Sequence, residues 1–146
     1  MTIIEIVSTH VSALTTAGFS FIHGPKAYMN LKVDEQALPV AWLGYPIVSE
    51  DTITASGYIE PSYNLQILFA NKTQLDNTPE QQQVIIQQMR TAAREFILRL
   101  QADNDNVRRV SGVRRADIQN ITDVPLSGCY LTITIIPFDE SSNCIT

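Results

Sequence analysis

A chain of 146 residues, 45% of them hydrophobic and 17% charged, has the usual length of one domain and enough apolar side chains to form a core. This balance excludes an intrinsically disordered chain, and no apolar run reaches the ~20 residues that a membrane-spanning helix needs. The formal net charge of -5 disfavours a dedicated nucleic-acid binder, because such proteins place basic residues on phosphates.

The first predicted element is a helix that begins at Ile3 and closes at Gly18. Its first twelve residues contain Glu5 but neither Lys nor Arg, so we expect no signal peptide and a cytoplasmic origin. Gly18 is expected to be the C-cap, since glycine readily adopts the left-handed conformation that ends many helices. The apolar residues recur at helical spacing: Ile3, Ile4, Ile6, Val7, Val11 and Leu14.

Short strands and long connections are predicted between residues 19 and 62. Residues 19–24 and 39–48 are apolar segments that end at, or are interrupted by, glycine and proline. Residues 49–62 are polar and are predicted to be a turn-rich connection. Because long connections often carry binding sites, we expect functional surfaces in this part of the chain.

Residues 63–70 alternate in polarity and predict a strand, with Leu68 on the same side as the polar residues. The inward face is expected to carry Tyr63, Leu65, Ile67 and Phe69.

The strongest helix signal follows this strand. Thr78 is a predicted N-cap, Pro79 occupies the first helical position, and Gln81 completes a capping box. Residues 103–106 are expected to end the helix. Its apolar stripe is predicted to be Ile85, Met89, Ala92, Ala93, Phe96, Ile97 and Leu100.

Two more strands complete the predicted fold. Residues 107–122 indicate an exposed strand with an irregularity at Gly112, and residues 127–138 indicate a long strand with Leu131, Ile133 and Ile135 on one face. We therefore predict a single α+β domain over residues 1–138, with a mostly antiparallel (mixed) sheet and two helices packed on one face. Residues 139–146 are expected to form a flexible C-terminal tail.

The sequence predicts no catalytic residue, no cofactor-binding residue and no metal ligand. His10 and His23 lack partners at the spacing of a zinc or nucleophilic site. Asp103 and Asp105 resemble the start of a calcium loop, but the glycine and the glutamate that such a loop needs are missing. Two cysteines, Cys129 and Cys144, make no disulfide framework. We therefore expect a protein that is not an enzyme and that acts through its surfaces.

Two groups of residues are candidates for such surfaces. Four of the ten basic residues lie within eight positions: Arg108, Arg109, Arg114 and Arg115. This cluster predicts either a solvated or salt-bridged strand, or a surface that contacts an acidic partner or passing DNA. Trp42 and Tyr45 predict either core or interface residues, or an aromatic platform for a ligand.

The order of elements resembles that of the tail-terminator, tail-completion and head–tail neck ring proteins of tailed bacteriophages. The resemblance is carried by residues 3–18, 63–100 and 126–138. It implies a tail-terminator-like fold and a structural virion protein that forms a homo-oligomeric ring at the head–tail junction or tail end. The implied partners are further copies of the chain, neighbouring portal, neck or tail proteins, and DNA that passes through the lumen without sequence-specific binding. We expect no membrane to be involved, and we expect the arginine cluster to be a contact between subunits.

Two other classes of function remain open from the sequence. One is a small-molecule-binding or regulatory α+β domain, in which Trp42 and Tyr45 line a pocket. The other is an enzyme of unrecognised type that uses His23 and a carboxylate such as Asp34.

Overall fold

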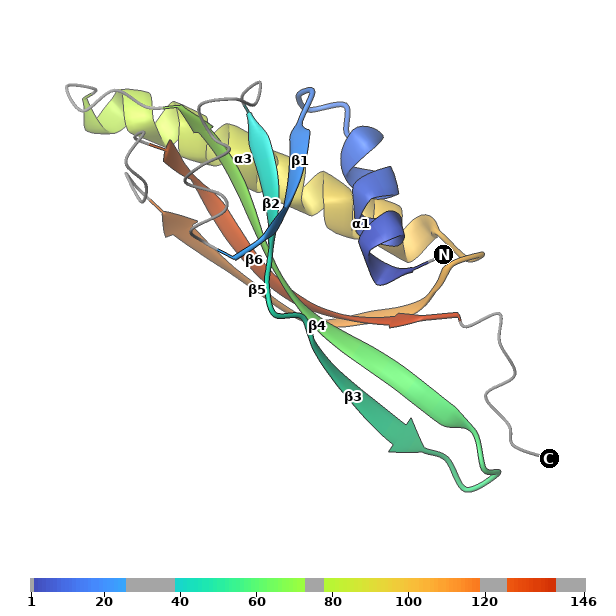
Figure 1. The fold of residues 1–146 in the computed structure, drawn as a ribbon. Coiled ribbons are helices and arrows are strands. Elements are labelled where there is room, and N and C mark those ends of the chain that lie inside the picture. The colour runs from blue at the N-terminus through green and yellow to red at the C-terminus, as the bar shows by residue number, and fades with distance from the viewer. Residues whose placement is uncertain (1, 26–38, 73–77, 119–125, 139–146) are drawn as a thin grey trace.

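The computed structural model describes residues 2–25, 39–72, 78–118 and 126–138. Figure 1 shows one twisted sheet, with the helices of the described residues lying along the same side of it. In chain order the elements are α1 (Ile3–Ser12), β1 (Ser20–Gly24), β2 (Val40–Gly44), β3 (Val48–Ile53), β4 (Ile59–Lys72), α3 (Pro79–Ala102), β5 (Val107–Ile118) and β6 (Leu126–Pro137).

The six strands form one mixed sheet in the order β1-β2-β4-β6-β5, and β3 pairs with the remaining part of β4. Strands β1 and β2 are parallel, and the other pairings are antiparallel. The 14-residue strand β4 is central, because it pairs with β3 and then β2 along one edge and with β6 along the other. The predicted α+β fold, a mostly antiparallel sheet with two helices on one face, is confirmed.

The main core lies between the helices and the sheet. The predicted inward residues of β4 and β6 are confirmed, and the Phe96 ring of α3 packs at a centroid distance of 5.6 Å from the Phe69 ring of β4. Helix α1 contributes Ile6, Val7 and Val11 to the same cluster. Both helices are therefore held chiefly by apolar burial against one sheet face.

A second buried cluster lies on the opposite face of the sheet. Leu68 and Ala70 of β4 belong to it, since alternate residues of a strand point to opposite faces. The sequence prediction that placed Leu68 on the side of the strand opposite Leu65, Ile67 and Phe69 is confirmed, and at this end of β4 that side is also buried. The cluster consists of Ile22, Val40, Trp42, Leu68, Ala70 and Leu126.

Helix α1 is shorter than predicted. It begins with a capping box between Thr2 and Glu5, and it ends at Ser12 with Ala13 rather than Gly18 as the C-cap. Leu14 donates its backbone N–H to Val11 at 3.2 Å in a last tight turn, and the chain then leaves the helix.

Helix α3 confirms the predicted capping box between Thr78 and Gln81, with proline in the first turn. The predicted apolar stripe is wrong at its start, because Ile86 rather than Ile85 is fully buried. The buried positions are Ile86, Met89, Ala92, Ala93, Phe96 and Leu100.

The predicted turn-rich connection over residues 49–62 is wrong. Its residues form β3 and the first part of β4, which make a β-hairpin from Val48 to Asn64. All six residues of β3 are exposed, so neither face shows the apolar alternation by which a half-buried strand is predicted.

Strand β5 confirms the predicted exposed strand and its irregularity. Gly112 has a φ of 62°, and the pairing with β6 shifts register between Ser111 and Arg114, which defines a β-bulge. The strand ends at Ile118, and the predicted strand residues 119–122 lie outside the described residues, as does the predicted tail at 139–146.

Candidate interaction surfaces

One exposed part of the fold is a two-stranded arm, residues 48–62, made by β3, the turn after it and the start of β4. Figure 1 shows the arm extending away from the helices and from the rest of the sheet. In the described pairing, β6 meets β4 only from Tyr63 onward, so β3 is the strand that pairs with residues 59–62. The arm is thus a ribbon of two strands without a third strand beside it in the part of the chain that the structure describes.

Hydrogen bonds within the turn hold the tip of the arm in one conformation. The backbone N–H of Thr54 donates to the Tyr58 carbonyl at 2.8 Å, and the N–H of Gly57 donates to the Thr54 carbonyl at 3.0 Å. Gly57 has a φ of 87°, which glycine adopts without strain. The tip is therefore an ordered turn.

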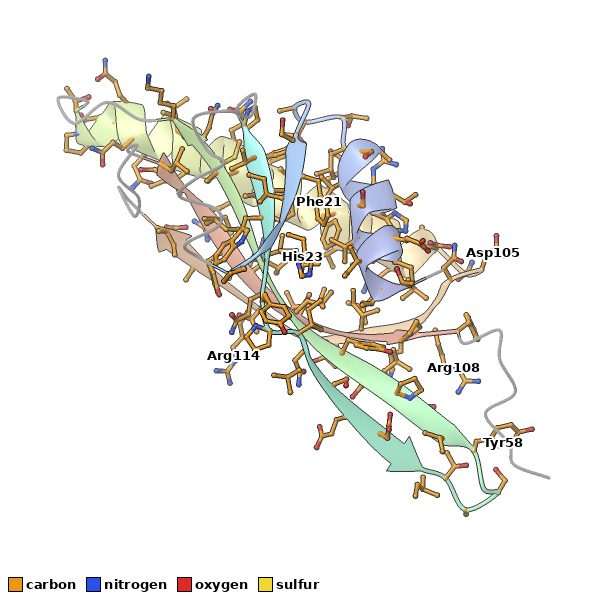
Figure 2. The ribbon with its side chains drawn as sticks, in the orientation of Figure 1. Phe21, His23, Tyr58, Asp105, Arg108 and Arg114 are labelled. Atoms are coloured by element: carbon orange, nitrogen blue, oxygen red, sulfur yellow. The ribbon has the colours of Figure 1, made fainter. Side chains whose placement is uncertain are left out.

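Apolar side chains on the arm face solvent. The exposed fractions are 57% for Val48, 75% for Ile53 and 51% for Tyr58, and Figure 2 shows Tyr58 at the far end of the arm. An isolated two-stranded ribbon is only marginally stable in water, and exposed apolar groups of this kind mark interaction surfaces. The arm therefore has the character of a segment that is buried against a partner.

The predicted arginine cluster is divided into separate parts. Arg108 and Arg109 both pair with Glu60 of the arm, at 2.8 Å and 3.5 Å respectively. A register shift between Val107 and Arg109 makes this possible, because adjacent residues of a regular strand would point to opposite faces. Arg108 also lies over the Phe138 ring, 5.4 Å from its centroid. These two arginines connect the arm, close to its tip, to the beginning of β5.

Arg114 and Arg115 lie on opposite faces of the sheet. Arg114 is paired in register with Thr132, and Figure 2 shows its side chain projecting away from the sheet at a different place from Arg108. Arg115 is paired with Leu131, whose side chain belongs to the core under the helices. The four arginines therefore do not make one continuous patch.

Arg115 instead belongs to a groove between α3 and β5. This α3–β5 groove has a volume of about 320 Å³ and contains three arginines from two elements. Arg90 pairs with Asp117 of β5 across a distance of 3.5 Å. The grouping was not predicted, because residues 90, 94 and 115 are brought together only by the packing of the helix on the sheet. The lining residues are Gln87, Arg90, Thr91, Arg94 and Arg115.

The two candidate aromatic residues have different surroundings. Trp42 is 8% exposed, belongs to the second core cluster, and donates its indole N–H to the Gly24 carbonyl at 2.8 Å. Tyr45 is 64% exposed, and its ring lies 6.2 Å from that of His23. Trp42 is therefore a core residue, whereas Tyr45 presents its ring to solvent.

Both histidines make hydrogen bonds within the fold. His10 of α1 contacts Asp103 through Nε2 at 2.7 Å, and His23 contacts the Leu43 carbonyl through Nδ1 at 3.0 Å. Burial opposes ionisation of Asp103, but the hydrogen bonds from His10 and Asn106 lower the pKa of its carboxyl. Asp103 therefore joins α1 to the end of α3. Asp34, the proposed partner of His23, lies outside the described residues.

Metal ligands and membrane-spanning helices are not found in the described ranges. No group of three or more His, Cys, Asp or Glu residues is placed there to hold a metal ion. No described helix is long and apolar enough to cross a membrane. Cys129 is a buried free thiol whose pKa is raised by that burial, and Cys144 lies outside the described residues.

Glu95 of α3 is a structural residue that the sequence did not reveal. Its carboxylate accepts the backbone N–H groups and both hydroxyls of Thr15 and Thr16, at 2.8–3.0 Å, and an N–H of Arg99 at 2.9 Å. Burial opposes ionisation, but these donors outweigh it and lower the pKa of Glu95 from 4.5 to about 2. Glu95 therefore fixes the chain where it leaves α1.

We expect Glu95→Gln to lower the free energy of unfolding by about 2 kcal/mol at pH 7, because a neutral amide accepts these hydrogen bonds less strongly. A lowered pKa stabilises the fold above pH 4.5, and this contribution disappears as the pH falls toward 2. Urea denaturation of both proteins at pH 7, 4 and 2.5 measures the difference. Glu80→Gln, at an exposed position in the first turn of α3, serves as the control. A difference between wild type and Glu95→Gln that did not shrink with falling pH would contradict the assignment.

Comparison with known proteins gives no family for this chain: no family model matches it, and no curated protein matches it.

Proposed function

We propose that this chain is a structural protein that assembles into a ring in the virion of a tailed bacteriophage, at the head–tail junction or the tail end. The observation that carries the proposal is the two-stranded arm, which is ordered, exposes apolar side chains and extends beyond the body of the molecule. Such an arm gains stability when a neighbouring molecule buries it. The proposed function is therefore assembly rather than the conversion of a substrate.

The arrangement of the arm supports a ring rather than a symmetric dimer. An arm that binds a different surface of the next copy makes a heterologous contact, and contacts of this type close into rings when the rotation between copies permits. Further contacts to portal, neck or tail proteins complete the proposed position in the virion.

The sheet face away from the helices supports the proposed passage of DNA. Beyond the second core cluster, β4 and β6 present uncharged polar groups on this face: Thr134 donates to Asn64 at 2.7 Å, and Tyr130 donates to Gln66 at 2.8 Å. Arg114 of β5, opposite Thr132, adds a single cation beside them. Hydroxyl and amide groups release few counterions from DNA, so a wall of this composition would let the polymer slide. Together with the net charge of -5, this supports a conduit that does not bind DNA tightly.

The proposal is tested by the state of the purified chain and by its place in the particle. We expect size-exclusion chromatography with light scattering to show a defined multimer, and negative-stain electron microscopy to show closed rings. Antibodies against the chain are expected to label phage particles at the head–tail junction or the tail end. The proposal would be contradicted if the antibodies labelled no part of the virion and the melting temperature of the purified chain rose with one small metabolite. That result would favour a ligand-binding domain.

A further inference from the structure

We propose that neighbouring copies join by extending the sheet: β3 of one copy pairs with β5 of the next as antiparallel strands, with Asp51 opposite Arg115. This inference rests on the proposed ring function and specifies the contact that closes the ring. The partner of β5 at its free edge is therefore the arm of a second copy of this chain.

The described sheet has a free strand edge on each side. β5 is the last strand on one side, and β3 pairs with β4 alone on the other side. Among the described residues, one long edge of each of these two strands therefore has no partner strand. Unpaired backbone N–H and C=O groups along such an edge are a template for a strand of another chain. Because β3 and β5 lie on opposite sides of one sheet, a contact between them joins two molecules.

The directions of the strands make this pairing antiparallel. β3 and β5 run in opposite directions, because three successive antiparallel pairings lie between them: β3 with β4, β4 with β6, and β6 with β5. A second copy in the same orientation, with its helices on the same side of the extended sheet, presents its β3 antiparallel to β5 of the first. Repeated from copy to copy, this is the heterologous contact that a ring requires.

The backbone groups of Asp51 and Arg115 point toward the free edges. The N–H of Thr54 donates to the Tyr58 carbonyl, and every second pair along an antiparallel ladder is hydrogen-bonded, so the pair of Asp51 and Pro61 is not. The missing N–H of proline agrees with this assignment. The N–H and C=O of Asp51 therefore point away from β4. Followed across β4 and β6, the same alternation points those of Arg115 away from β6.

The side chains of Asp51 and Arg115 lie on the same side of the extended sheet. Ser49 is opposite Tyr63, which packs against the main core under the helices, and Asp51 follows Ser49 by two residues. Arg115 is opposite Leu131, which belongs to the same core. When the two sheets are continuous, the carboxylate and the guanidinium therefore meet on the helix side.

Charge selects the register in which Asp51 meets Arg115. Both residues are exposed, and neither has an ion pair with a described residue. Arg115 shares the α3–β5 groove with Arg90 and Arg94, so a carboxylate from the neighbour enters a site with three cations. A register shifted by two residues would instead place Asp51 opposite Asp117, and like charges directly opposite are destabilising.

A second carboxylate and a second arginine meet on the other side of the sheet. Glu50 and Arg114 each lie beside the first pair in the chain, so both point to the face away from the helices. In this register Ala116 is opposite Glu50, and Arg114 is its diagonal neighbour at about 7–8 Å, within reach of a long side chain. The contact thus also neutralises the cation on the face that the proposed function assigns to DNA.

The apolar residues at the two ends of β3 find apolar partners in the same register. Val48, which is 57% exposed, is opposite the half-buried Ile118, and Ile53, which is 75% exposed, is opposite Val113, which is 43% exposed. Cross-strand pairs of β-branched residues stabilise antiparallel sheets. The exposed apolar groups of the arm are therefore partly buried by the strand that its charges select.

Proline substitutions at the two free edges test the contact. We expect Asp51→Pro and, separately, Arg115→Pro to raise the dissociation constant of the multimer by about 100-fold or more, because each removes an outward N–H and a charge. Light scattering across a concentration series measures it. Each N–H points away from the subunit's own sheet, so both variants should keep the wild-type circular dichroism spectrum.

Mixing the two proline variants is the sharper measurement. The Asp51→Pro chain keeps an intact β5 edge, and the Arg115→Pro chain keeps an intact β3 edge. An equimolar mixture should therefore form a 1:1 dimer that does not grow, at concentrations where each variant alone is monomeric. A mixture that stays monomeric would overturn the proposed contact.

A disulfide reports the register without changing the backbone. Glu50→Cys with Ala116→Cys, in a Cys144→Ser background, places two thiols opposite each other with Cα atoms about 4.5 Å apart, within disulfide range. Oxidation should give a ladder of oligomers that a reductant removes. Asp51→Cys with Ala116→Cys is the matched control and should give no ladder, because its thiols lie on opposite faces.

The contact and the ring function can fail separately. Rings that persist in both proline variants, or equal ladders from the two cysteine pairs, would overturn the β3–β5 contact and leave the ring function standing. A wild-type chain that is monomeric at every concentration, with antibodies that label no part of the virion, would overturn both.

Discussion

Replacing Phe96 by alanine is expected to lower the free energy of unfolding by about 3–5 kcal/mol. Phe96 is fully buried at the centre of the main core, and its ring packs on Phe69, which in turn meets Phe19 edge-on at 5.6 Å. Truncation removes this burial and leaves a cavity between helix and sheet. Urea denaturation followed by the fluorescence of Trp42, the single tryptophan, measures the loss.

Leu98→Ala is the matched control for Phe96→Ala. Leu98 lies on the same helix two residues further on, and it is 54% exposed. We expect its replacement to change the free energy of unfolding by less than about 1 kcal/mol. Equal losses in the two variants would mean that α3 packs on the sheet through a different face.

Gly128→Ala is expected to lower the free energy of unfolding by about 3 kcal/mol or more, because the strands cannot accommodate an added methyl group. Gly128 of β6 lies opposite Ala70 of β4, and a Cβ built at this position would stand 2.8 Å from the Ala70 Cα and closer still to the Phe69 carbonyl oxygen. Both obstacles are backbone atoms of the central strand. Only a separation of β4 from β6 would relieve the overlap.

Gly18→Ala provides the comparison for Gly128→Ala. A Cβ at Gly18 would meet nothing within 4 Å, so this change should be close to neutral in the same denaturation measurement. A Gly128→Ala protein as stable as wild type would show that β4 and β6 do not pair in this register.

The parts of the fold that the sequence predicted well are those governed by local rules. The capping box at Thr78 and the alternation of Leu131, Ile133 and Ile135 depend on neighbours in the chain, and both are confirmed. The end of α1 was missed because it depends on Glu95, about eighty residues away. The side on which Leu68 lies was predicted correctly, but the second buried cluster to which it belongs was not, because periodicity alone does not reveal that one strand is buried on both faces.

The candidate surfaces were harder to predict, for related reasons. Strand β3 is exposed on both faces and is held in the sheet by its pairing with β4, so its polar sequence resembles that of a loop between two elements. The four arginines are close in sequence, but the register shifts of β5 and the alternation of strand faces divide them between the arm, the open sheet face and the groove. The groove exists only because α3 packs beside β5.

The arm and the body of the molecule share one uninterrupted strand, β4, which runs from Ile59 to Lys72. In a ring assembled through the arm, the rotation from each copy to the next is therefore set by the twist of this strand rather than by a flexible joint. The number of copies that close the circle follows from that rotation. Substitutions that increase or decrease the twist of β4 would therefore alter the circumference of the assembly while leaving the individual subunit intact.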